Sequence, residues 1–181
     1  MTTTLSKFTL ITLLTVLFSS YAMAEAAPVI DAKVDVALKQ FKKKKGAAEF
    51  VKKAYAVLVF PSVVKGGFGI GGEYGEGAVR VDGNTTAYYK ITSASFGFQL
   101  GVQKTSYVFA FKDKDILDSF MKSNGWEAGV DGSVTVAKWG AGKDISSISF
   151  EKPIYAFVFG AKGFMYNLTF EGTKFTKFNP E

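Results

Sequence analysis

A glycine-rich stretch at residues 63–77 constrains the fold of this chain more than any other feature. Seven of its fifteen residues are glycine; five of these glycines fall on odd positions, whereas Phe68, Ile70 and Tyr74 fall on even positions. A period of two is the period of a β-strand. One face of this strand would carry apolar side chains and the other would be nearly bare backbone. A bare face lets another strand, a helix or a ligand approach closely, at a cost in strand propensity.

Most of the chain around this stretch also predicts β-structure. Eighteen phenylalanines and nineteen glycines are typical of a β-rich protein with tight turns. We predict that a strand at 57–60 ends at Pro61, that the glycine-rich strand runs to Val81, and that Asp82-Gly83-Asn84 forms a hairpin turn. Further strands are predicted at 86–92, 95–103, 106–111, 133–139, 148–150, 154–159, 164–170 and 174–178. This spacing favours hairpins in an antiparallel sheet that curls or closes into a barrel.

Three segments have helical periodicity. Residues 29–41 carry one apolar stripe, acidic residues near the start and lysines near the end, the order that the helix dipole favours, and Gly46 is a natural stop. A short helix is predicted at 47–54. A third, at 113–123, would interrupt the strands, with Asp113 or Asp115 as its N-cap. The fold class predicted is therefore α+β, a β-rich curled sheet or barrel with N-terminal basic helices and one inserted helix.

Residues 1–24 resemble a secretory signal peptide. Lys7 gives a positive start, residues 8–18 are apolar, and Ala22-Met23-Ala24 is a small-x-small cleavage site; a second cut after Ala26 also fits. The alternative, a transmembrane anchor, needs a longer apolar run of about 20 residues. We therefore expect a single domain at 25–181, exported to the periplasm or secreted. No cysteine follows the leader, so membrane contact would be peripheral and non-covalent.

The composition excludes several kinds of catalytic site. The chain has no histidine and no cysteine, which rules out a His–Cys zinc site, a Ser-His-Asp triad and a thiol nucleophile. The residues Gly67-x-Gly69-x-x-Gly72 match the dinucleotide fingerprint formally, but that motif needs a helix after it, and residues 73–81 predict a strand. We expect no catalytic residues and no cofactor.

The acidic residues are open to two interpretations. Glu73 and Glu76 could form a carboxylate pair for glycoside chemistry, but three positions apart on a strand they face opposite sides, so solvated surface charge is the favoured interpretation. The aspartates of 113–118 are more simply helix-start residues than calcium ligands, because the oxygen-rich loop with a central glycine is missing. We therefore predict no metal site.

The distribution of lysine is more informative. Residues 29–53 hold eight lysines and three acidic residues, a net charge of +5, whereas the chain from Ala54 onward has a net charge of +1. A basic amphipathic helix is typical of a surface for anionic membranes or acidic partners. The alternative is a solvated face that keeps the protein soluble. Export disfavours nucleic acid as the partner. The candidate lipid-binding residues are Lys39, Lys42, Lys43, Lys44, Lys45, Lys52 and Lys53.

Several motifs, in this order along the chain, resemble the SYLF domain family. They are Val57–Pro61 with Val64–Gly77, Tyr88-Tyr89 with Ala94–Gly101, Gly129–Val134, and Lys162-Gly163 with Leu168–Lys174. The resemblance spans about residues 29–178. It implies a non-enzymatic, lipid-binding module whose lipid association is linked to a basic N-terminal segment, and bacterial members are exported envelope proteins. It also implies actin binding in the yeast branch, which an exported protein would not share.

Two functions follow as expectations. The first is a lipid-binding protein of the bacterial envelope that docks on anionic phospholipid through the basic N-terminal segment. The second is a periplasmic protein-interaction or scaffold module that uses the bare glycine face or an exposed sheet edge to bind an envelope protein. Whether the phenylalanine-rich interior also takes up an acyl chain is left open, with an ordinary core favoured.

Overall fold

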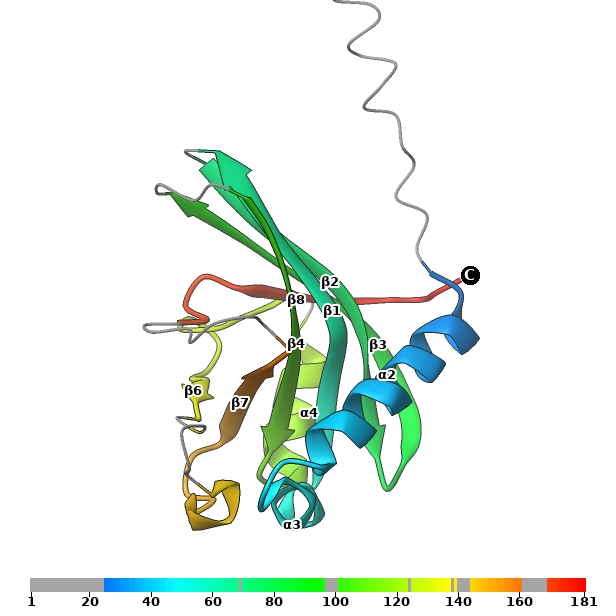
Figure 1. The fold of residues 1–181 in the computed structure, drawn as a ribbon, viewed down its shortest axis with the longest axis vertical. Helices are drawn as coiled ribbons and strands as arrows, with labels where there is room; N and C mark the ends of the chain where they lie inside the picture. The colour runs from blue at the N-terminus through cyan, green and yellow to red at the C-terminus, as the bar shows by residue number, and fades with distance from the viewer. Residues whose placement is uncertain are drawn as a thin grey trace, which may run out of the picture.

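The computed structural model describes residues 25–68, 70–96, 101–123, 125–137, 139, 144–160 and 169–181. Within them, eight strands form one curled, mostly antiparallel sheet in the order β5-β8-β3-β2-β1-β4-β7-β6 (Figure 1). The helices are α2 (Ala27–Lys42), α3 (Ala47–Lys53), α4 (Lys114–Lys122) and the 3₁₀-helix η1 (Ile145–Ser147). The strands are β1 (Ala56–Phe68), β2 (Ile70–Val81), β3 (Asn84–Phe96), β4 (Gly101–Phe111), β5 (Trp126–Glu127), β6 (Thr135–Val136), β7 (Ile154–Phe159) and β8 (Lys174–Phe178). The predicted fold class is confirmed.

The sheet has a hydrophobic core on each face. Because side chains alternate along a strand, Val57 and Val59 of β1 point to the face covered by α2 and α3, whereas Leu58 and Phe60 point to the face that curls around α4 (Figure 1). On the inner face, aromatic side chains pack on one another, as in the Phe109–Phe175 pair with ring centroids 5.1 Å apart. The buried phenylalanines of this face, among the described residues, therefore pack as an ordinary core, which is the interpretation that the sequence favoured.

The helices form where the sequence predicts them. The apolar stripe of α2 is buried against the sheet at Ile30, Val34, Ala37 and Phe41. In α4, the side chain of Asp113 accepts a hydrogen bond from the backbone N–H of Ile116 at 3.0 Å, which satisfies one of the free donors of the first turn. Asp113, and not Asp115, is the N-cap.

The prediction that β1 ends at Pro61 is wrong. The strand continues to Phe68, and its pairing with both neighbours shifts register between Val59 and Val63. Proline has no N–H to donate to the sheet, and this β-bulge takes it out of the regular ladder. The long single glycine-rich strand is also wrong. The stretch spans two strands, β1 and β2, that pair with each other as far as Phe68 and Ile70.

The predicted strand at 95–103, of which residues 97–100 lie outside the described residues, is wrong for a related reason. β3 ends at Phe96 and pairs with β2, whereas β4 begins at Gly101 and pairs with β1, so the alternating pattern runs across two non-neighbouring strands. Among the described residues of the predicted strand at 133–139, only Thr135–Val136 are strand, and they pair in parallel with β7. Residues 148–150 form no strand, and β5 was not predicted. Most of the predicted strand at 164–170 lies outside the described residues, as does the leader.

Glycines let the backbones of β1 and β2 approach at the bulge. A Cβ at Gly75 would lie 2.9 Å from the carbonyl oxygen of Ser62, and one at Gly77 would lie 2.2 Å from that of Val59. At Gly75 and Gly77, the bare face predicted from the sequence is therefore filled by the neighbouring strand β1. The predicted hairpin turn is present at Asp82 and Gly83, both with positive φ.

Candidate functional site

The seven candidate lysines gather at one end of the molecule, where α2 passes into α3 (Figure 1). Lys39 and Lys42 lie in the last turns of α2. Lys43, Lys44 and Lys45 lie in the connection between the helices, and Lys52 and Lys53 lie at the end of α3. All seven side chains are exposed. We call Lys39, Lys42, Lys43, Lys44, Lys45, Lys52 and Lys53 the lysine cluster.

The fold brings these lysines together through the turn at Gly46. Gly46 has a left-handed backbone (φ 80°), and a Cβ there would lie 2.1 Å from Oδ1 of Asp144. The backbone N–H of Ile145 also donates to the carbonyl oxygen of Lys45 at 3.0 Å. The turn is therefore held against η1, so the lysines project from a fixed part of the surface.

Within the described part of the chain, the lysine cluster has one ion pair, between Lys45 Nζ and Asp144 Oδ2 at 3.4 Å. The pKa of Asp144 is lowered by hydrogen bonds from the backbone and side chain of Ser146 and, to a smaller extent, by Lys45. The carboxylate stays ionised and offsets part of the charge of Lys45. The other six lysines keep their charge available for an external anion.

The apolar faces of the two helices are already used inside the protein. Phe41 of α2 and Phe50 of α3 are fully buried against rings of the sheet, with Phe50 and Phe157 centroids 5.0 Å apart. An amphipathic helix that inserts its apolar face into a bilayer needs that face free. The lysine cluster is therefore suited to contact with charged headgroups at the surface.

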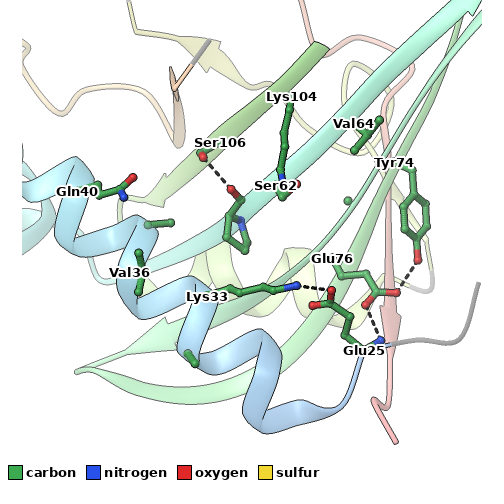
Figure 2. A pocket seen from close by; sticks show the side chains of 14 residues that line it. Glu25, Lys33, Val36, Gln40, Ser62, Val64, Tyr74, Glu76, Lys104 and Ser106 are labelled. Carbon is green, nitrogen blue, oxygen red and sulfur yellow. Dashed lines mark hydrogen bonds and ion pairs between the residues drawn. The ribbon is translucent and has the colours of Figure 1, made fainter. Parts of the chain in front are cut away.

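A groove lies between α2 and the sheet (Figure 2). It has a volume of about 660 Å³ and is lined by α2, β1, β2 and β4. Val36, Val64 and Tyr74 are its exposed apolar residues, with 56%, 43% and 41% of their surfaces accessible. Lys33 and Lys104 also line it. The sequence carries no local signal for this groove, because its residues come from four elements that are separate along the chain.

One end of the groove is built around Glu76 (Figure 2). Its side chain is only 9% exposed; Oε2 accepts a hydrogen bond from the backbone N–H of Glu25 at 3.0 Å, and Oε1 accepts one from the Tyr74 hydroxyl at 2.5 Å. Lys90 Nζ lies 3.8 Å from Oε1. Burial and the neighbouring Glu76 raise the pKa of the Tyr74 phenol, which therefore stays a hydrogen-bond donor. The first described residue of the chain is thus attached to β2.

Glu73 lies on the opposite face of β2 and is buried, with 7% of its surface accessible. The Tyr107 hydroxyl donates to its Oε2 at 3.2 Å, and Oε1 has no hydrogen-bond partner among the described residues. Burial raises the pKa of the Glu73 carboxyl, and the charge of Lys65 and the Tyr107 hydrogen bond oppose this only in part. The prediction that Glu73 and Glu76 face opposite sides is confirmed. The prediction that they are solvated surface charges is wrong, because both pack against neighbouring elements.

Replacing Glu73 with glutamine is expected to stabilise the protein at neutral pH. The pKa of Glu73 is higher in the folded protein than in the unfolded chain, where it has the ordinary value of 4.5. The folded protein therefore binds this proton more tightly, and the stability that the protonated carboxyl contributes is lost as the pH rises from 4.5 through the raised pKa. Removing one poorly satisfied buried charge is worth on the order of 1 kcal/mol, or about 2–4 °C in Tm.

Thermal unfolding of the Glu73→Gln variant between pH 4 and pH 8 measures this effect. The gain in Tm should be present at pH 7 and vanish toward pH 4. The matched control is Glu171→Gln, a change at an exposed glutamate, which should leave Tm within about 1 °C. A Glu73→Gln variant that is less stable than the wild type at pH 7 would show that the ionised carboxylate is needed in the fold.

The sequence also gave no signal for the ion pairs that attach α2 to the sheet. Arg80 Nη2 lies 2.7 Å from Asp35 Oδ1 and 3.4 Å from Asp31 Oδ1. Thr85 and Tyr88 of β3 donate to Asp31 at 2.7 and 2.9 Å. The helix dipole explains why the two aspartates lie early in α2, but their hydrogen-bond partners lie about 50 residues away in sequence. This anchor fixes the helix that carries part of the lysine cluster.

Other kinds of site find no support in the part of the chain that the structure describes. No group of three His, Cys, Asp or Glu residues there could hold a metal ion. The helices that the structure describes are too short or too polar to cross a bilayer. β2 after the glycine motif is a strand, so the helix that a dinucleotide fingerprint requires is not there.

Residues 92–180 match the family model of Ysc84, described as Las17-binding protein actin regulator. The match covers almost half of the chain, from the end of β3 through β8. No curated protein matches the sequence. The matched region includes α4 and the strands on both sides of the β3-β2-β1 centre of the sheet, whereas the lysine cluster lies before it.

Proposed function

We propose that this chain, whose residues 92–180 match the Ysc84 (SYLF) family model, is a non-enzymatic lipid-binding protein of the bacterial envelope. In this proposal the leader is removed on export, and the mature protein docks on the anionic surface of a phospholipid membrane. The lysine cluster makes the contact, and the sheet and α4 act as the rigid body that presents it. No cofactor or metal takes part.

The observation that carries this proposal is the exposure of seven lysines on one end of the fold, of which one is paired within the described residues. Each lysine near an anionic bilayer contributes about 1 kcal/mol to binding. Six or seven such contacts are enough for reversible docking without an inserted helix. The alternative, a solvated face with no ligand, does not require the lysines to be held by a closely packed turn at Gly46.

The test is co-sedimentation of the mature protein with vesicles that contain anionic phospholipid. Changing Lys42, Lys43 and Lys44 to glutamine is expected to weaken binding roughly 100-fold, because three contacts of about 1 kcal/mol are lost and 1.4 kcal/mol corresponds to tenfold. Lys45 is left in place because it pairs with Asp144. All three replaced side chains are exposed, so the fold should be unaffected.

The matched control changes three exposed lysines outside the cluster, Lys104 of β4, Lys122 of α4 and Lys177 of β8, to glutamine. It loses the same net charge, so an effect of net charge alone would weaken both variants equally. Equal weakening, or full binding by the cluster variant, would contradict docking through the lysine cluster.

The second candidate is a protein-interaction role, and the groove favours it. The family description names Las17 binding and actin regulation, which belong to the proteins for which the family is named. An exported protein does not meet cytoplasmic actin, so a partner here would be another envelope protein. Exposed Val36, Val64 and Tyr74 give the groove an apolar floor for such a partner. Failure of all vesicle binding would make this the leading function.

The positions of the two glutamates of the glycine-rich stretch support the proposal that the protein is not an enzyme. Glu73 and Glu76 lie on opposite faces of β2, so the two carboxylates cannot act on the same bond of a substrate.

A further inference from the structure

We propose that removal of the leader after Ala24 creates a ligand for this protein's own groove, namely the α-ammonium group of Glu25, which the Glu76 carboxylate binds. The inference rests on the export that the proposed function requires. It assigns a role to the buried carboxylate at the end of the groove and fixes which of the two cleavage positions is used.

The geometry of the bond between these two residues carries the proposal. The backbone nitrogen of Glu25 lies 3.0 Å from Oε2 of Glu76 (Figure 2). In the precursor this nitrogen is a neutral amide. When a signal peptidase hydrolyses the Ala24–Glu25 bond, water supplies a hydroxyl to the carbonyl carbon of Ala24 and a proton to the nitrogen of Glu25. The products are a carboxylate and an amine that is protonated at neutral pH, since an α-amino group has a pKa of about 7.7–8.0.

Glu76 is prepared for a cation at this position. Its side chain is 9% exposed and is oriented by the Tyr74 hydroxyl, while the nearest cation among the described residues, Lys90, is 3.8 Å away. The existing hydrogen bond is already charge-assisted through its carboxylate acceptor. An ionised donor at 3.0 Å adds the direct attraction between opposite charges. The carboxylate of Glu25 does not compete for the ammonium, because it pairs with Lys33 of α2.

The same contacts distinguish the two cleavage positions. The carbonyl oxygen of Ala26 accepts from the N–H groups of Val29 and Ile30 at 2.9 and 3.1 Å, which are the first hydrogen bonds of α2. A cut after Ala26 would remove this carbonyl together with Glu25, its bond to Glu76 and its ion pair with Lys33. A cut after Ala24 keeps all of them and adds the charge. The structure therefore assigns the mature N-terminus to Glu25.

Two measurements test the proposal. The first is the intact mass of the chain after export by a bacterial host, which should correspond to residues 25–181. A chain that begins at Ala27, or that keeps its leader, would overturn the assignment.

The second measurement is a double-mutant cycle on thermal unfolding. One change retains Ala24 as an extra N-terminal residue, which moves the ammonium by about 3.8 Å. The other is Glu76→Gln. Each of the four chains is released from a fusion by a protease that leaves no other residue. We expect the extension to lower Tm by about 2–4 °C in the Glu76 chain, and by less than about 1 °C in the Glu76→Gln chain.

An extension that lowers Tm equally in both backgrounds, or in neither, would overturn the proposal. Vesicle binding of the four chains should stay the same, because Lys42 and its neighbours lie at the other end of α2. A negative result in this cycle is thus distinguishable from a failure of the proposed lipid binding.

Discussion

Replacing Phe41 with alanine is expected to lower the free energy of unfolding by about 3–5 kcal/mol, the cost of removing a fully buried phenylalanine. Phe41 is 0% exposed and lies among three rings, Phe157, Phe159 and Trp139, with centroids at 5.0, 5.5 and 6.3 Å. These rings belong to the sheet and to a neighbouring segment that cannot collapse into the space. Tm should fall by roughly 6–20 °C, since 1 kcal/mol corresponds to about 2–4 °C in a chain of this size.

The matched control for Phe41→Ala is Val36→Ala, on the same helix but 56% exposed. It should change the free energy of unfolding by less than about 0.5 kcal/mol. Urea denaturation followed by circular dichroism measures both variants. A Phe41→Ala variant as stable as the control would show that α2 is not packed on the sheet as described. The lysine cluster would then not be held at a fixed place by the packing of α2 on the sheet.

Replacing Gly77 with alanine is expected to cost about 3 kcal/mol or more, although only one methyl group is added. A Cβ at Gly77 would lie 2.2 Å from the carbonyl oxygen of Val59 and 2.8 Å from the ring of Phe60. The first neighbour is backbone within a strand that pairs on both sides, so it cannot move without breaking ladder hydrogen bonds. Overpacking of a rigid site costs typically 1–3 kcal/mol and occasionally more.

The control for Gly77→Ala is Gly72→Ala on the same strand, where the nearest atom to a Cβ is the carbonyl oxygen of Ser93 at an ordinary 3.7 Å. Both changes remove the same backbone freedom from the unfolded chain, so their difference isolates the clash. Chemical denaturation of the two variants measures it. Equal stability of the two would mean that β1 and β2 do not approach at the bulge.

How far the sequence predicts this fold depends on whether a signal is local. The stripe of α2, the cap at Asp113 and the turn at Asp82-Gly83 are local patterns, and each is confirmed. The end of β1 was mispredicted because proline is excluded only from regular strands, and whether a bulge receives it depends on both neighbouring strands. The 95–103 pattern failed because alternation continues across a change of strand.

The candidate site divides in the same way. The lysine cluster is contiguous in sequence, so composition alone identifies it, and the structure adds that its members are exposed and held by Gly46. The groove joins residues of α2 and β4 that are more than 60 positions apart, and the Arg80 anchor and the burial of Glu73 depend on pairs 45 and 34 positions apart. Charge at a single position in a strand does not reveal whether that position is covered. Only the packing of α2 and β4 on β2 shows it.

The measurement that tests lipid docking most directly is a binding titration of the mature wild-type protein on vesicles, with and without anionic phospholipid, at low and high salt. If the lysine cluster docks on anionic headgroups, binding requires anionic lipid. It also weakens strongly from 0.01 M to 1 M salt, because the Debye length falls from about 30 Å to about 3 Å. Binding to neutral vesicles that is unaffected by salt would contradict this docking and would place the lipid site in the groove or the β-rich body.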